Sequence, residues 1–184
     1  MRAPLLLLID FQKAFTEIAR DLARNNTDAE HHAARLLAHW RARRWPLLHV
    51  RHDSMDSHSR FRAGASGNAF MDFAVPQDNE PIIAKAVNSA FIGTDLAGRI
   101  DALGRPRIVM TGATTDHCVS TTARMAGNLG YDTVLVTDAM FTFDRVAHNG
   151  ALIRAEDIHQ AHLASLAGEF AALSTAEAIL RANG

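Results

Sequence analysis

The sequence predicts an α/β protein, a doubly wound three-layer sandwich with a parallel sheet covered by helices on both faces. Two observations lead to this prediction. Short apolar runs of strand length alternate along the chain with longer stretches that carry helix start and stop signals. The first run, residues 4–9, is continuously apolar, which is typical of a strand buried on both faces. A strand, a crossover helix and a parallel strand form a right-handed unit, so the repeated alternation predicts one such sheet.

The predicted elements follow in a regular order. Strands are expected at residues 4–9, 46–52, 81–85, 107–111, 133–137 and 171–173. Helices are expected from the capping-box pattern at residues 27–30 to residue 44, over residues 94–104, over residues 118–129, over residues 156–170, and after a second capping-box pair formed by Ser174 and Glu177. Residues 53–79 lack periodicity and are rich in Ser, Gly, Asp and Asn, which is typical of a binding loop or lid.

Composition narrows the classes of function. The 184-residue chain has a formal net charge of −1 and a hydrophobic fraction of 48%. No basic face is indicated, so nucleic acid is not expected as a partner. The apolar run at residues 4–9 is too short to span a bilayer and lacks the cleavage site of a signal peptide. We therefore expect a cytoplasmic protein of one domain, residues 1–184, with a small-molecule substrate and no membrane partner.

Three chemically active side chains lie at the ends of predicted strands. Asp10 follows the first strand, Lys85 ends the third, and Cys118 lies in the turn after the fourth. In doubly wound sheets, ligands bind outside the carboxyl ends of the strands. Cys118 is the only cysteine, and its position at a helix start favours the thiolate. Asp10 could accept the thiol proton, Lys85 could lower the thiol pKa, and backbone N–H groups could form an oxyanion hole. These roles suit acyl transfer from a small amide.

Other interpretations of these residues stay open. Cys118 could be a small buried hydrophobe, Asp10 a turn cap and Lys85 a solvated surface residue. A papain-like Cys–His pair is a further possibility. His117 neighbours Cys118 but projects in a different direction, and the more distant candidates are His49, His52 and His148.

Metal and phosphate sites have weaker support. Asp56 and His58, with His52 nearby, have spacings that could hold a divalent ion, and His159 and His162 lie three residues apart. No Cys-x-x-Cys or His-Glu-x-x-His pattern accompanies either pair, and no glycine-rich fingerprint follows the first strand. We predict no metal and no cofactor, and leave open whether the Asp56/His58 loop binds a metal.

The chain resembles the isochorismatase-like cysteine hydrolases over nearly its whole length. The matching segments are residues 8–12 with Phe15, Lys85 with residues 88–91 and 93–96, residues 112–119, and residues 131–139. The resemblance implies a six-stranded parallel sheet and an Asp–Lys–Cys triad of Asp10, Lys85 and Cys118. It also implies a cis peptide between Ala113 and Thr114, an oxyanion hole from the N–H groups of Thr114 and Cys118, and a homo-oligomer, a dimer or larger.

Departures from the family pattern narrow the expected activity. The nicotinamidases carry an Asp-x-His metal motif after the second strand, which residues 51–54 lack. Isochorismatases hydrolyse a vinyl ether and do not need the thiol, so Cys118 favours hydrolysis of a C–N bond through a thioester. The alternatives are ether hydrolysis with Asp10 as the acid, and a non-catalytic thiol sensor. Residues 53–73 are expected to determine specificity, and the predicted pocket residues are Phe15, Phe61, Asn88, Phe91, His117 and Phe141.

Overall fold

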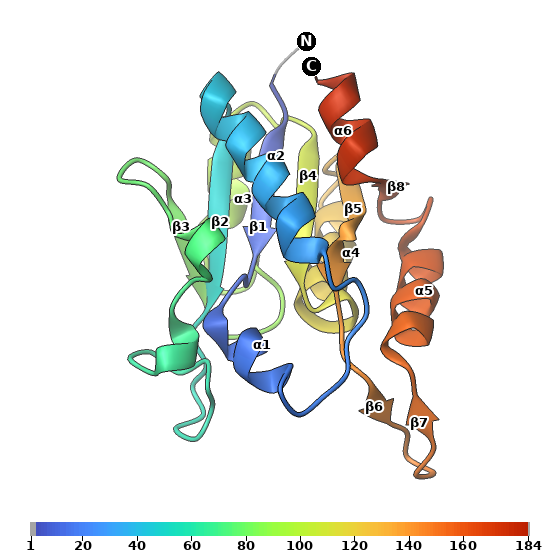
Figure 1. Ribbon diagram of the computed structural model, residues 1–184. Helices are drawn as coiled ribbons and strands as arrows, with labels where there is room; N and C mark the ends of the chain where they lie inside the picture. Colours follow the sequence, from blue (N-terminus) through green and yellow to red (C-terminus); the bar gives the residue numbers. More distant parts are fainter. Residues whose placement is uncertain (1–2, 184) are drawn as a thin grey trace.

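The computed structural model describes residues 3–183 and has an all-parallel sheet of six strands at its centre (Figure 1). The strand order is β3-β2-β1-β4-β5-β8. The strands are β1 (Leu5–Ile9), β2 (Leu47–His52), β3 (Ile82–Lys85), β4 (Ile108–Ala113), β5 (Thr133–Phe141) and β8 (Ala172–Ser174). The predicted α/β fold with a six-stranded parallel sheet is confirmed.

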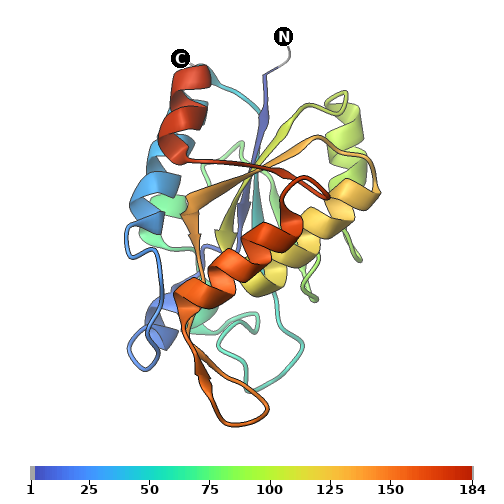
Figure 2. The same ribbon diagram turned by 90° about the vertical axis from the view of Figure 1, so that its right-hand side faces the viewer.

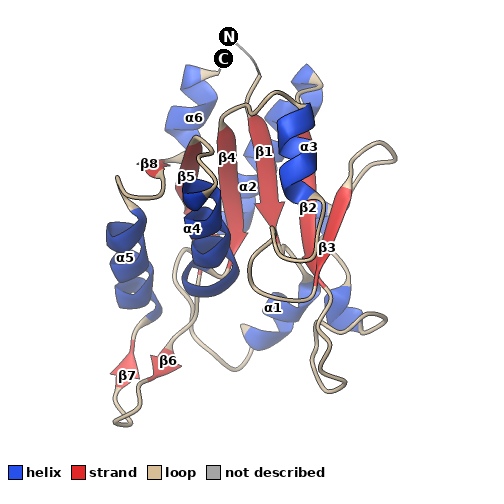
Figure 3. Cartoon of the chain, turned by 180° about the vertical axis from the view of Figure 1, so that it is seen from behind, coloured by secondary structure: helices blue, strands red, loops and turns tan. Residues whose placement is uncertain are grey.

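Helices cover both faces of the sheet. One layer consists of α1 (Lys13–Ile18), α2 (Ala29–Arg43) and α6 (Ala176–Ala182), in front of the sheet in Figure 1. The other consists of α3 (Leu96–Ala102), α4 (Ser120–Asn128) and α5 (Ala155–Leu166), in front in Figure 3. Side chains alternate along a strand, so Leu6 and Leu8 of β1 pack in the first core while Leu5, Leu7 and Ile9 pack in the second. The continuous apolar run of β1 therefore serves two hydrophobic cores.

The two central strands define the place where a ligand would bind. The chain builds β1, β2 and β3 towards one edge of the sheet, then returns to the centre and builds β4, β5 and β8 towards the other. The carboxyl ends of β1 and β4 therefore flank the topological switch point, where doubly wound sheets open a crevice. The strands are very close there, because a Cβ on Gly112 of β4 would lie 2.1 Å from the carbonyl oxygen of Ile9. Gly112 also has a φ of 143°, so the position requires glycine.

Several element boundaries differ from the predicted ones. β5 continues past residue 137 to Phe141, and α5 ends at Leu166 rather than at residue 170. Neither predicted capping box forms. Asp28 precedes α2 without a side-chain cap, and α6 is capped by Thr175, whose Oγ1 accepts a hydrogen bond from the N–H of Ala178. The predicted cap was one residue too early because Ser174 is the last residue of β8, which leaves Thr175 to cap the helix.

The short elements were not predicted. Helix α1 lacks a side-chain cap and is held by burial of Ala14 and Phe15, which is a tertiary effect. The antiparallel hairpin of β6 (Arg145–Val146) and β7 (Leu152–Ile153) is shorter than any periodic pattern that could reveal it. It projects at the carboxyl side of the sheet (Figures 1 and 2). Residues 53–79 are irregular as expected, apart from the 3-10 turns η1 (Ser66–Asn68) and η2 (Asp72–Ala74). None of the described helices has the length and apolar character needed to cross a membrane.

Candidate active site

Lys85 brings the strand-end residues together. Its Nζ lies 2.7 Å from Oδ2 of Asp10, 3.3 Å from Sγ of Cys118 and 3.1 Å from Nδ1 of His52. The side chains of Lys85 and Asp10 are both fully buried. Lys85 is therefore not a solvated surface residue, and all three predicted catalytic side chains converge beside the switch point of the sheet. His52 is the additional member of this cluster.

Asp10 is placed by an unusual backbone conformation. Its φ of 53° lies in the left-handed region, which non-glycine residues seldom adopt. Its N–H still donates to the carbonyl oxygen of Val50 at 3.0 Å, so the chain turns directly at the end of β1. Burial raises the pKa of Asp10, and the neighbouring Lys85 ammonium opposes this rise. Asp10 thus faces a cation inside the protein rather than capping a turn at its surface.

Cys118 lies in a single π-helical turn, η3 (Thr115–Val119), that leads into α4. Its side chain is buried, and Oδ1 of Asn88 lies 3.9 Å from Sγ. Burial, together with the Asp10 carboxylate, raises the pKa of the Cys118 thiol to about 12, although Lys85 acts in the opposite direction. The expectation that the helix start favours the thiolate is therefore wrong for the unliganded protein. Desolvation and the Asp10 carboxylate outweigh the Lys85 ammonium, so the resting group is a neutral thiol beside a proton acceptor.

Thr114 forms the turn between β4 and the nucleophile. The peptide bond between Ala113 and Thr114 is cis. The carbonyl oxygen of Thr114 accepts hydrogen bonds from the N–H groups of His117 and Val119, both at 3.2 Å. Its Oγ1 is buried and has no hydrogen-bond partner within residues 3–183. An oxyanion hole formed by the N–H groups of Thr114 and Cys118 stays a prediction.

The histidines considered as partners of Cys118 have other contacts. Exposed His117 lies 3.4 Å from Nη2 of Arg145, and Arg145 in turn pairs with Asp116 at 2.7 Å. His49 is buried and pairs with Glu80 at 2.9 Å. His148 is exposed in the turn between β6 and β7. His52 alone among the candidates reaches the cluster, where its Nδ1 contacts Lys85.

The predicted aromatic pocket residues separate into two groups. The ring of Phe15 contacts those of Phe61 and Phe141, with centroids 4.9 and 5.7 Å apart, and Phe61 also contacts His52. Phe143 joins this group by stacking on Phe15, with the ring centroids 6.1 Å apart.

Phe91 lies elsewhere. Its ring stacks on Tyr131, with the centroids 5.7 Å apart, and packs with the core on the opposite face of the sheet. Of the remaining predicted pocket residues, Asn88 lies beside Cys118. The ring of His117 instead contacts Asp116 and Arg145.

Phe143, two residues beyond the end of β5, was not predicted, although the sequence carries a signal for it. Phe141 and Phe143 are two residues apart, as expected for side chains on one face of an extended chain. The polar residues Thr137 and Asp138 make the strand look finished before this pair is reached.

The possible metal ligands do not form a fitting site. Asp56 and His58 are exposed, and Oδ1 of Asp56 accepts a hydrogen bond from the N–H of His58 in a local turn. Within residues 3–183, the only three metal-type donors that lie together are those of Asp10, His52 and Cys118, all within 4.8 Å of one another. The Lys85 ammonium contacts all three and occupies the position that a cation would need.

The paired histidines on α5 are also separate. His159 is buried with its Nδ1 2.8 Å from Oγ1 of Thr115, whereas Nδ1 of His162 lies 3.3 Å from Oγ of Ser120. The two rings therefore contact different residues on either side of Cys118, Thr115 and Ser120, and do not converge on one ion.

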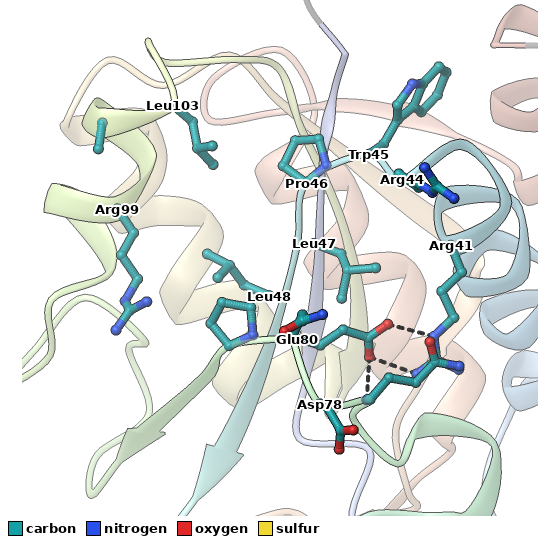
Figure 4. A pocket seen from close by; sticks show the side chains of 14 residues that line it. Arg41, Arg44, Trp45, Pro46, Leu47, Leu48, Asp78, Glu80, Arg99 and Leu103 are labelled. Atoms are coloured by element: carbon teal, nitrogen blue, oxygen red, sulfur yellow. Dashed lines mark hydrogen bonds and ion pairs between the residues drawn. The ribbon is translucent and has the colours of Figure 1, made fainter.

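A hollow of about 1060 Å³ lies away from these residues (Figure 4). It opens where β2 and β3 begin, at the edge of the sheet opposite to Cys118. Its most buried acid, Glu80, is held by Arg41 through two contacts of 2.7 Å (Figure 4). Since its lining includes none of Asp10, Lys85 and Cys118, this hollow is not the candidate active site.

Comparison with known proteins assigns the chain to one family. A family model of the isochorismatase domain matches residues 4–178, a range that includes Asp10, Lys85 and Cys118. The chain belongs to the isochorismatase family. The resemblance identified from the sequence motifs is thereby confirmed, and the protein is a hydrolase of this family.

Individual family members are similar over most of the chain. A crystal structure of an isochorismatase-family protein from Chromobacterium violaceum ATCC 12472 has a TM-score of 0.93 and 42% identity, covering 99% of this chain and 96% of that chain. The isochorismatase family protein YrdC of Bacillus subtilis (strain 168) is 40% identical over 175 residues, covering 95% of this chain and 93% of YrdC. Maleamate amidohydrolase of Pseudomonas putida is 30% identical over 156 residues, covering 76% and 72% of the two chains.

Proposed function

We propose that this isochorismatase-family hydrolase cleaves the C–N bond of a small amide through a thioester on Cys118. The observation that carries the proposal is the position of the Lys85 ammonium, 2.7 Å from Oδ2 of Asp10 and 3.3 Å from Sγ of Cys118. A thiol, a proton acceptor and a fixed cation beside both are the groups needed for nucleophilic acyl transfer. The similarity to maleamate amidohydrolase supports an amide as the substrate class.

The first step would move a proton from Cys118 to Asp10 as sulfur attacks the carbonyl carbon. Both pKa values are raised by burial, so Asp10 is able to hold the proton and the thiol does not ionise without an acceptor. Lys85 contacts both groups and therefore stabilises the negative charge before and after it moves from oxygen to sulfur. The result is a new C–S bond and a tetrahedral intermediate with a negative oxygen.

The second step would expel the amine. In this proposal the N–H groups of Thr114 and Cys118 bind the oxyanion, and Asp10 returns its proton to the leaving nitrogen. Ammonia or an amine departs and the acyl group stays on sulfur. Asp10 then removes a proton from water, whose oxygen attacks the thioester. The acid is released and the thiol is regenerated, so the net reaction consumes one water for each amide bond.

A screen for ammonia release over small amides, ureido compounds and lactams tests this proposal. Removing the nucleophile in Cys118→Ala should lower turnover by roughly three orders of magnitude or more. Intact-mass measurement during turnover should detect the acyl adduct on the single cysteine, and hydroxylamine should remove it. If no compound of these classes reacts and no adduct forms, the proposal is wrong.

Ether hydrolysis with Asp10 as the acid is the second candidate. Burial raises the pKa of Asp10, which is the direction of shift that a general acid requires. This reaction does not need sulfur, so Cys118→Ala should largely retain it while Asp10→Asn should abolish it. Turnover that persists in Cys118→Ala would replace the thioester route by this one.

The proposal also covers the substrate class, the oligomeric state and the cellular location. We expect a small-molecule substrate, a homo-oligomer and a cytoplasmic location. Size-exclusion chromatography with light scattering measures the oligomeric state directly.

A further inference from the structure

We propose that His52 is a positioning residue whose Nδ1 accepts a hydrogen bond from Lys85 and holds the ammonium between Asp10 and Cys118. The catalytic consequence of this role rests on the proposed function, whereas the role itself is a property of the folded protein. The distance between Nδ1 of His52 and Nζ of Lys85 is 3.1 Å. The two residues are register partners on β2 and β3.

The geometry of the ammonium explains why a third acceptor is needed. A lysine ammonium has three N–H donors, and each must be satisfied when the group is buried. Asp10, Cys118 and His52 supply one acceptor each, at 2.7, 3.3 and 3.1 Å. Without His52 one donor would be buried and unpaired, and the long side chain would be free to tilt away from Cys118.

The sheet topology explains why this acceptor comes from β2. Lys85 lies on β3, whereas Asp10 follows β1, and β2 stands between these two strands. The lysine side chain must therefore extend across the carboxyl end of β2, where His52 is located. His52 therefore lies beside the extended Lys85 side chain and also contacts its ammonium group.

The backbone and ring of His52 are both restrained. The side chain of Gln12 forms two hydrogen bonds with the backbone of His52. Its Oε1 accepts from the N–H of His52 at 2.8 Å, and its Nε2 donates to the carbonyl oxygen of His52 at 3.1 Å. Asn68 donates to the same carbonyl oxygen at 3.1 Å. The imidazole ring of His52 packs edge-on against the ring of Phe61, with the centroids 5.9 Å apart. The acceptor is thus presented by a fixed element rather than by a mobile loop.

The surroundings keep the imidazole neutral, as an acceptor must be. Burial and the Lys85 charge lower the pKa of His52, whereas Asp10, Asp53 and the Val87 carbonyl act in the opposite direction. With its Nδ1 lone pair directed at Lys85, the ring carries its proton on Nε2. The same lone pair is unavailable to Cys118, which distinguishes this role from that of the base in a Cys–His pair.

Lysine NMR provides a direct test, because Lys13 and Lys85 are the only lysines of the chain. Protein labelled with ¹⁵N-lysine should give one protected side-chain signal from buried Lys85, and Lys13→Arg confirms its assignment. His52→Leu should accelerate proton exchange at Lys85 about tenfold or more. His52→Asn should keep exchange within about threefold of the wild-type rate, because the amide oxygen of Asn lies near the Nδ1 position. The matched control is His58→Leu, which replaces an exposed histidine of the adjoining loop and should leave the exchange rate of Lys85 unchanged.

The outcomes separate the two proposals. Unchanged exchange at Lys85 in folded His52→Leu would overturn the positioning role, as would equal acceleration in His52→Leu and His52→Asn. If His52→Leu does not fold, His52→Gln replaces it, since its amide oxygen lies beyond the Nδ1 position and should not rescue exchange. If the exchange rates of Lys85 agree with the prediction but no amidase activity is found, the positioning role of His52 is supported and the proposed function is contradicted. Where amidase activity exists, His52→Leu should lower kcat with little change in KM.

Discussion

Nζ of Lys85 lies 3.3 Å from Sγ of Cys118, although β2 and β1 separate β3, which ends at Lys85, from β4, which precedes the turn of Cys118. Adjacent strands are about 4.8 Å apart, so only a long side chain can bridge that interval from β3. The contact therefore depends on the length of lysine and on the register of β3, and it places a cation at a nucleophile that is distant in the sheet.

Replacing Lys85 by methionine should abolish activity. The substitution keeps an unbranched side chain but removes the charge that stabilises both Asp10 and the thiolate, so we expect kcat to fall by about a hundredfold or more. Lys85→Arg should not restore it, because a planar guanidinium presents its donors differently from an ammonium. Ammonia-release kinetics provide the measurement, with Lys13→Met on the surface as the control. Activity in Lys85→Met near the wild-type level would contradict this role.

Gly112→Ala should be strongly destabilising. The new Cβ would lie 2.1 Å from the carbonyl oxygen of Ile9, and the backbone conformation at φ 143° disfavours any side chain. We expect a loss of about 4 kcal/mol or more, or failure to fold. Gly64→Ala is the matched control, since Gly64 also has positive φ but has no atom within 4 Å of its Cβ position. Thermal unfolding should show a much smaller loss for the control, and equal losses would mean that crowding between β1 and β4 is unimportant.

Glu80 should contribute stability that depends on pH. Burial favours its neutral form, but hydrogen bonds from Arg41, the Gln77 N–H and His49 outweigh burial and lower its pKa from 4.5 to about 2. A lowered pKa in the folded state gives stability that is present above pH 4.5 and lost as the pH falls towards 2. Glu80→Gln should reduce the free energy of unfolding by about 2 kcal/mol at neutral pH.

Urea titrations across this pH range measure the effect. The difference between wild type and Glu80→Gln should shrink as the pH falls through the window. Asp78→Asn, an exposed acid at the same hollow, should show no such trend (Figure 4). A difference that is constant with pH would show that the carboxylate charge is not the stabilising element.

Phe61 and Phe91 should behave differently although the sequence placed both in the pocket. Phe61 is half-buried against Phe15 and against His52 of the cluster, so Phe61→Ala should raise KM for apolar amides about tenfold. Phe91 stacks on Tyr131 in the other core, so Phe91→Ala should lower the melting temperature and leave KM unchanged. Steady-state kinetics and thermal unfolding of the two variants make the comparison. An equal change in KM in the two variants would contradict the assignment of Phe61 to the pocket and of Phe91 to the core.

The features predicted from the sequence were those with strong local signals. Continuous apolar runs indicated the strands, and the ends of those runs indicated Asp10, Lys85 and the Cys118 turn. The role of His52 could not be predicted, because it depends on β2 lying between β1 and β3 and on the register that pairs His52 with Lys85. Both are tertiary properties. The sequence therefore showed His52 only as one histidine among several possible bases.

The thiol is the clearest case in which local reasoning failed. The helix start and Lys85 favour ionisation of Cys118, and both can be inferred from neighbouring residues. Burial acts against ionisation and prevails, and the degree of burial depends on packing from several segments of the chain. Similarly, Thr175 rather than Ser174 caps α6, because the end of β8 determines which hydroxyl faces the helix.

The central claim is that Cys118 carries the acyl group during hydrolysis of a C–N bond. Rapid-quench mass spectrometry with an amide substrate tests it most directly. We predict that wild-type protein gains the mass of the acyl group on Cys118 at the rate of ammonia release, and that Cys118→Ala neither gains it nor turns over. Continued turnover by Cys118→Ala, with no adduct on the wild-type protein, would contradict the claim.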